Sequence, residues 1–325
     1  MVCRRRWRIW AAMMVVGAMP AMLAPGAAAP APVPTAKDFE AAVARDMPGM
    51  RDQVVKSVLA VASSVARNKA AADVATDFSA SGLGVNSKRP EVKLNAAILI
   101  HDLNTLSTDS YLIQMLQNAD PAVRYWAAKG LADISKGMMA AGPNRIVTAL
   151  GQQSQVETSA VVEQAMIQAL IQYGAVSPLL DALNAVSSQM EAAIPDVSAL
   201  QTAAQGLTFV SRAMGTVSPA DKIKAATVAA RLVSFAAQQQ KNNESAIKAI
   251  DPAGALPPEY VAAVKSAVDA GVKTINGAAS KPFPVPTGVN ADELLLNVNG
   301  LVGKDVQADA NLKSVPAPPK VKTAP

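Results

Sequence analysis

The middle of the chain repeats two helical sequence patterns in alternation, and this regularity restricts the fold more than any other feature. The stretch PEVKLNAAILIHDL (90–103) aligns with PAVRYWAAKGLADI (121–134), and QTAAQGLTFV (201–210) and, more weakly, VVEQAMIQALIQY (161–173) repeat it. Between these copies lie YLIQML, RIVTAL and PLLDAL, which end at Leu116, Leu150 and Leu183. Two helix patterns that alternate at a period of roughly 30 to 40 residues predict stacked helical hairpins.

The clearest copy, DPAVRYWAAKGLADI (120–134), has the local signals of a helix. Asp120 is a good N-cap, and Pro121 suits the first helical position, where its missing N–H is not needed. Val123, Ala127 and Leu131 then fall on one narrow, Ala-rich face. No alternating β-branched run indicates a strand, so the sequence predicts an all-α class with about five helical pairs and irregular ends.

The segment LIQMLQNADPAVRYWAAKGLADI (112–134) resembles a HEAT repeat. The resemblance implies a helical-hairpin solenoid, with a turn at Asp120-Pro121 and the second helix over Val123–Ile134. It also implies a structural polar ladder between repeats, to which Asp120 and Arg124 would contribute. The neighbouring copies carry Arg89, Lys93 and Glu163 at these places, so the ladder is not expected to be continuous.

The two ends of the chain differ from its middle in composition. MVCRRRWR is a basic segment, IWAAMMVVGAMPAML is an apolar one, and APGAAA supplies small residues, which is the layout of a secretory signal peptide. We expect a signal peptide over residues 1–28, with a retained membrane anchor as the alternative. A Pro/Ala linker follows at 29–36, the HEAT-like domain at 37–279, and a Pro-rich, mostly disordered tail at 280–325, with one short helix in ADELLLNVNGLV. The Ala-rich signal is typical of bacteria, so the predicted location is periplasmic or extracellular.

Removal of this signal changes the charge balance. The chain has 30 Lys and Arg against 25 Asp and Glu, and four of the arginines lie in the signal, which leaves 26 against 25. A net charge of +1 does not favour nucleic acid as a partner. The single cysteine, Cys3, leaves with the signal as well, so the mature chain is expected to have no disulfide, thiol nucleophile or cysteine metal site.

Catalytic and metal motifs are missing from the sequence. His101 is the only histidine, and we interpret it as an exposed polar residue rather than a base or ligand. The chain has no Gly-x-Ser-x-Gly, phosphate-binding loop, His-Glu-x-x-His or calcium-loop sequence. A Ser–Lys pair stays open. The sequence therefore predicts a protein that is not an enzyme, with no cofactor and no metal.

Arg124, Tyr125 and Trp126 are the candidate partner-binding residues. Trp126 is the sole tryptophan after the signal, and exposed Tyr, Trp and Arg are enriched in binding hot spots. The competing interpretation, which we favour, is that they pack on the neighbouring repeat. The predicted function is an exported scaffold or adaptor for an unknown protein partner. The alternative is an amphipathic helical protein that contacts lipid or the envelope surface, although its narrow apolar faces suit that function poorly. A hydrolase of unknown type is a third interpretation.

Overall fold

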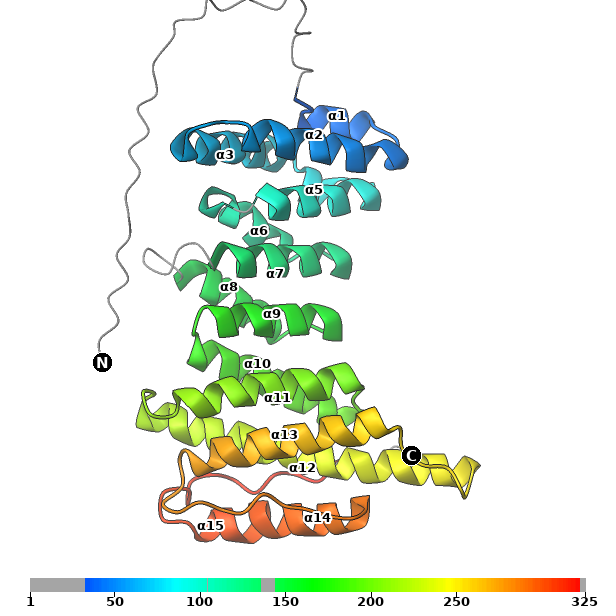
Figure 1. Cartoon of the computed structure of the whole chain (residues 1–325), viewed down its shortest axis with the longest axis vertical. Coiled ribbons are helices and arrows are strands. Elements are labelled where there is room, and N and C mark those ends of the chain that lie inside the picture. The colour runs from blue at the N-terminus through cyan, green and yellow to red at the C-terminus, as the bar shows by residue number, and fades with distance from the viewer. Residues whose placement is uncertain (1–32, 104, 136–143, 322–325) are drawn as a thin grey trace, which may run out of the picture. The chain divides into compact units, whose positions relative to one another are not determined.

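The computed structural model describes residues 33–103, 105–135 and 144–321. The predicted signal peptide and the first half of the predicted linker, residues 29–32, lie outside these residues. Every regular element within them is helical, which confirms the all-α prediction (Figure 1). In this described part of the chain, no helix combines the length and the apolar character that crossing a membrane would need.

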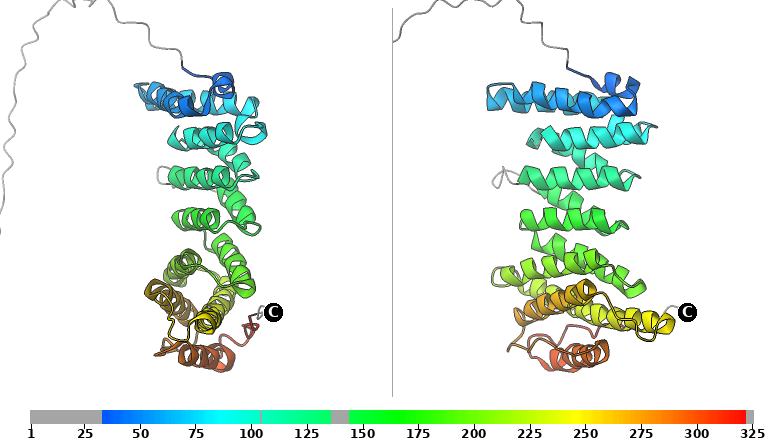
Figure 2. Two further views of the ribbon diagram at one scale, coloured as in Figure 1. Left: turned by 90° about the vertical axis from the view of Figure 1, so that its right-hand side faces the viewer. Right: turned by 45° about the vertical axis from the view of Figure 1, so that its right-hand side comes forward.

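The helices of the repeats lie in two layers (Figure 2). Each helix contacts the next member of its own layer as well as its hairpin partner. We call one the odd layer: α5 (Pro90–Leu103), α7 (Pro121–Ser135), α9 (Ala160–Gln172), α11 (Val197–Ala213) and α13 (Pro258–Asn276). The even layer holds α6 (Asp109–Met115), α8 (Asn144–Ser154), α10 (Val176–Ala192) and α12 (Pro219–Ile250). This is the alternation that the sequence predicts for a helical-hairpin solenoid.

The N-terminal end is less regular. Its elements are α1 (Ala36–Ala41), η1 (Ala44–Asp46), α2 (Met47–Leu59), α3 (Ser64–Ala80), α4 (Leu83–Asn86) and the turn η2 (Leu106–Thr108). Thr35 caps α1 in a capping box with Asp38, in which each side chain accepts a hydrogen bond from the backbone N–H of the other residue. The α2 helix packs against α5, so it extends the odd layer by one member.

Helix α7 forms where its local signals place it. It begins at Pro121, and the Asp120 carboxylate accepts a hydrogen bond of 2.9 Å from the Ala122 N–H. Val123, Ala127 and Leu131 are fully buried between the layers. The N-cap prediction and the predicted buried face are both confirmed.

A glycine of the repeated pattern lets the two layers approach closely. A Cβ atom at Gly130 of α7 would lie 2.9 Å from a methyl of Leu112 in α6, and one at Gly206 of α11 would lie 2.7 Å from a methyl of Leu183 in α10. In each hairpin the second helix thus rests on a leucine of the first. The absence of a side chain at these two positions sets the spacing of the layers.

The C-terminal segment differs from the prediction of a mostly disordered tail at 280–325. Residues 280–321 contain α14 (Ala291–Gly300), a π-helical turn, η3 (Leu301–Asp305), and α15 (Val306–Ala308), and α14 packs along α12 (Figure 1). The segment buries eight large apolar side chains: Phe283, Val298, Leu301, Val302, Val306, Leu312, Val315 and Val321. Its physical role is to cover the last helices of the stack, whose apolar face would otherwise meet water. We call residues 280–321 the C-terminal cap; the last four residues of the predicted tail lie outside the described residues.

Candidate functional site

Arg124 connects two successive repeats. Its Nε and Nη2 atoms donate to the two carboxylate oxygens of Glu157, each at 2.7 Å, and its Nη1 donates to the Asn118 and Ala119 carbonyls. All three guanidinium nitrogens are therefore engaged, and only 12% of the side chain is exposed. This geometry fits a structural rung between α7 and the turn before α9 better than it fits a partner anchor.

Glu157 is suited to hold that rung. Its side chain is fully buried, and its Oε1 also accepts hydrogen bonds from the Thr158 and Ser159 N–H groups. Burial alone would raise its pKa, but the Arg124 guanidinium and these backbone donors outweigh burial, so the pKa of Glu157 is lowered. The carboxylate that pairs with Arg124 is therefore Glu157, from the turn of the following repeat. Asp120, which the resemblance places in the ladder, caps its own helix instead.

Tyr125 and Trp126, which follow Arg124 in α7, form an aromatic cluster. Their rings meet edge to face with centroids 5.7 Å apart, and the Lys129 ammonium lies 4.9 Å from the Trp126 ring centroid. Both aromatic side chains are half-buried and pack against the core. They therefore combine the two interpretations of the sequence: part of each ring packs on neighbouring residues, and part faces solvent.

His101 corrects the sequence interpretation, because it is not an exposed polar residue. Only 17% of its side chain is exposed, and its ring meets Trp126 edge to face at 5.0 Å. Nδ1 lies 2.9 Å from an oxygen of Asp102, and Nε2 lies 3.1 Å from an oxygen of Asp133 in α7. His101 points away from the core of its own helix, but the next helix of the odd layer covers that face. These partners orient the ring and connect α5 to α7.

The surface beside this cluster continues over the next helices of the odd layer. A groove of about 590 Å³ crosses α9, α11 and α13. Its lining is rich in amides and hydroxyls, around one half-buried aromatic ring: Gln168, Gln172, Gln205, Thr208, Phe209, Arg212, Ser266 and Asp269. Ser198 of α11 donates to the side-chain oxygen of Gln164 in α9, so the two helices are bonded directly across this face. We call this surface, from Tyr125 to Asp269, the odd-layer face.

Sequence reasoning did not select Lys129, Asp133, Phe209 or the glutamines as site residues. The sequence does contain the spacing of the glutamines. EQAMIQALIQ places Gln164, Gln168 and Gln172 four residues apart on one helix face. QTAAQ places Gln201 and Gln205 in the same register of the next copy. Periodicity alone could not show that these rows lie side by side.

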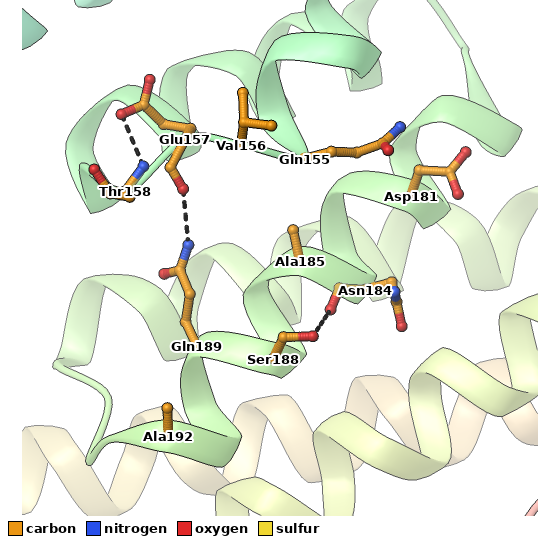
Figure 3. Close-up of a pocket in the computed structure, with 10 residues that line it drawn as sticks. All are labelled: Gln155, Val156, Glu157, Thr158, Asp181, Asn184, Ala185, Ser188, Gln189 and Ala192. Carbon is orange, nitrogen blue, oxygen red and sulfur yellow. Dashed lines mark hydrogen bonds between the residues drawn. The ribbon is translucent and has the colours of Figure 1, made fainter.

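A second hollow, of about 610 Å³, lies between the turn before α9 and helix α10 (Figure 3). Gln189 points from α10 toward this turn, where its Nε2 donates to the Glu157 carbonyl at 3.1 Å. The Ser188 hydroxyl donates to the Asn184 carbonyl of its own helix, and Asp181 pairs with Lys224 at 2.7 Å. The polar groups of the hollow thus bond mainly to the protein itself. Among the described residues, no basic side chain accepts the hydrogen bond of the Ser188 hydroxyl, which goes to a backbone carbonyl.

Glu163 lies beneath this hollow at the position that Arg124 has in the preceding repeat. It is 3% exposed, and Gln189 donates to its Oε1 at 3.3 Å. Burial, followed by the nearby Glu157 charge, raises the pKa of Glu163 to about 7, although the Gln189 hydrogen bond opposes the rise. The ladder is therefore interrupted at Glu163, as the sequence indicates, and an amide contact replaces the ion pair.

Comparison with known protein families identifies one match. Residues 110–138 match the family model of the HEAT repeat. This confirms the resemblance of that segment, which contains α7 and nearly all of α6. No curated protein matches the chain.

Proposed function

We propose that this chain is an exported, non-catalytic helical-repeat scaffold that binds another protein along the odd-layer face. The observation that carries the proposal is that α7, α9, α11 and α13 are successive neighbours in one layer, with an aromatic cluster on α7 and a groove across the other three helices. Repeat proteins with stacked helical hairpins present such extended surfaces to partners.

The chemistry of the odd-layer face favours a protein partner. Glutamine amides both donate and accept hydrogen bonds, so the rows on α9 and α11 can pair with polar groups of a bound chain. Tyr125, Trp126 and Phe209 offer partly exposed rings, which are typical interface anchors. The charged groups on this face are of both signs, with Lys129 near one end and Arg212 and Asp269 at the other, so neither an anionic membrane nor a nucleic acid is favoured.

The contacts of His101 and Ser188 support a non-catalytic role. The ring nitrogens of His101 lie on carboxylates rather than on a serine hydroxyl, and Ser188 bonds to backbone. Export is supported by the basic and apolar N-terminal segments. N-terminal sequencing of the protein recovered from its host tests it, and a mature start near residue 29 is the expected result.

Proximity cross-linking of the tagged mature protein in its own compartment, followed by mass spectrometry, tests the binding proposal. We expect one dominant protein partner that is lost on Tyr125→Ala/Trp126→Ala and on Gln168→Glu/Gln205→Glu. The second pair lies on exposed positions, so it separates loss of binding from loss of folding. Val156→Ser, at an exposed position beside the second hollow, is the matched control and should keep the partner.

Two outcomes would contradict the proposal. One is a partner that survives both odd-layer variants but is lost on Val156→Ser, which would move the binding surface to the hollow of Figure 3. The other is recovery of lipid or envelope material alone, together with flotation of the purified protein on anionic liposomes, which would favour a lipid-surface protein.

A further inference from the structure

A small cavity lies where the C-terminal cap meets the last hairpin. Its volume is about 210 Å³, and α12, α13 and residues 285–290 enclose it. The wall is mostly apolar, with Val261 and Val268 from α13, Val285 and Pro286 from the cap, and Leu294 from α14. The one neutral polar side chain that α12 contributes to the lining is Gln240.

Gln240 has an unmet hydrogen-bonding group. Its residue is only 6% exposed, and its Oε1 atom is buried without a hydrogen-bond partner among the described residues. The two preceding glutamines of α12 show the contrast. Gln238 accepts from the Val321 N–H at 2.8 Å, and Gln239 donates to the Met190 carbonyl at 2.7 Å. A buried polar atom without a partner is unfavourable, so its position in a cavity wall indicates that something else supplies the donor.

The size and charge of the cavity restrict what could supply it. An apolar protein cavity of about 150 Å³ can hold benzene, so this one has room for a single aromatic ring with one polar substituent. Lys265 also lines the cavity but is exposed, and Asp269 is ion-paired with Lys273 at 2.6 Å. The Lys265 side chain therefore has access to solvent and the Asp269 carboxylate has its own counter-ion, so neither presents an uncompensated buried charge to the cavity.

We propose that this cavity binds a compact, neutral aromatic molecule with one O–H or N–H donor, which donates to Gln240. The apolar wall supplies the driving force through burial of the ring, and Gln240 supplies orientation and selectivity for a donor. The cavity borders the odd-layer groove through Asp269 of α13, which lines both, but no other residue of its lining belongs to that groove, and the aromatic cluster lies on α7.

Titration of the full chain with phenol, followed by NMR and by calorimetry, tests this site. Benzene is the matched probe because it keeps the ring and lacks the donor. We expect saturable phenol binding with shifts confined to residues that line the cavity. One neutral hydrogen bond corresponds to about 0.5–1.5 kcal/mol, so benzene should bind roughly 2- to 12-fold more weakly.

Two variants separate the amide from the cavity. Gln240→Met removes the hydrogen-bonding amide while keeping a long side chain, so it should lower the affinity for phenol to that for benzene. Val261→Phe adds volume from a position that is 39% exposed, so it should abolish binding of both probes without disturbing the core. Gln168→Met, on the odd-layer face, is the control and should leave both affinities unchanged.

Three results would overturn the proposal. They are the absence of saturable phenol binding, equal affinity for phenol and benzene in the unaltered chain, and phenol binding that Val261→Phe leaves intact. The first would mean that solvent alone satisfies Gln240. If Gln240→Met fails to fold, the phenol–benzene pair and Val261→Phe still decide the question.

Discussion

Replacement of Glu163 by glutamine tests the electrostatic account of the interrupted ladder. The substitution keeps the size of the side chain and an oxygen that can accept from Gln189, but it removes the ionisable group. In the folded chain the pKa of this carboxyl is raised from 4.5 to about 7 because it is buried beside Glu157. The unfolded chain ionises it freely above pH 4.5, whereas the folded chain resists ionisation until about pH 7.

The sign of the effect follows from this difference. A raised folded-state pKa contributes stability at low pH, and the contribution is lost as the pH rises from about 4.5 through about 7. A rise in pKa of this size corresponds to roughly 3 kcal/mol of unfolding free energy. Glu163→Gln should therefore match the unaltered protein near pH 4.5 and exceed it in stability by as much as about 3 kcal/mol near pH 8.

Urea unfolding followed by circular dichroism, at a series of pH values between about 4.5 and 8, measures the difference directly. Glu259→Gln provides the control, because Glu259 is an exposed carboxyl in the first turn of α13. The control should show no comparable change with pH. A difference between Glu163→Gln and the unaltered protein that is constant over this range would refute the argument, because it would mean that Glu163 does not titrate differently on folding.

Two further changes test the Arg124–Glu157 ion pair and the packing of α7. Arg124→Ala should lower the unfolding free energy, measured in urea, by roughly 3–5 kcal/mol, because the fully buried Glu157 carboxylate would keep its charge without its counter-ion. The double variant Arg124→Ala/Glu157→Gln should recover part of this loss, and an unchanged loss would argue against a coupled pair. Leu131→Ala should cost roughly 2–5 kcal/mol, because the leucine is fully buried between repeats, and a loss under about 1 kcal/mol would contradict the packing described for α7.

The parts of the fold that the sequence predicts best are those that local signals decide. Asp120, Pro121 and the Val123/Ala127/Leu131 spacing act within one helix, so the start of α7 and its buried face could be inferred without knowing its neighbours. The alternation of helix patterns then gives the layering. Glu163 was visible as a departure from the repeat, although its protonation behaviour depends on burial that only the packed layers create.

The errors concern residues whose environment comes from distant segments. His101 faces away from its own helix's core, and only the position of α7 covers it with Trp126 and Asp133. Prolines dominate the composition of the C-terminal cap, so the sequence predicts a disordered tail there. Its apolar residues, among them Val298 and Val306, find a partner surface only once α12 and α13 are assembled. The cavity at Gln240 is of the same kind, since three separate parts of the chain enclose it.

The C-terminal cap also bears on how the protein behaves at high concentration. Stacked hairpins have no inherent length, and an uncovered last hairpin offers the same kind of surface that joins one repeat to the next within the chain. Two copies could then meet head to tail, and because such a contact does not close on itself, it would propagate into filaments. Asp309 accepts from the Ser280 N–H and hydroxyl and so ties the two halves of the cap together over the end of the stack. By covering this surface, residues 280–321 turn an open-ended architecture into a molecule of fixed length.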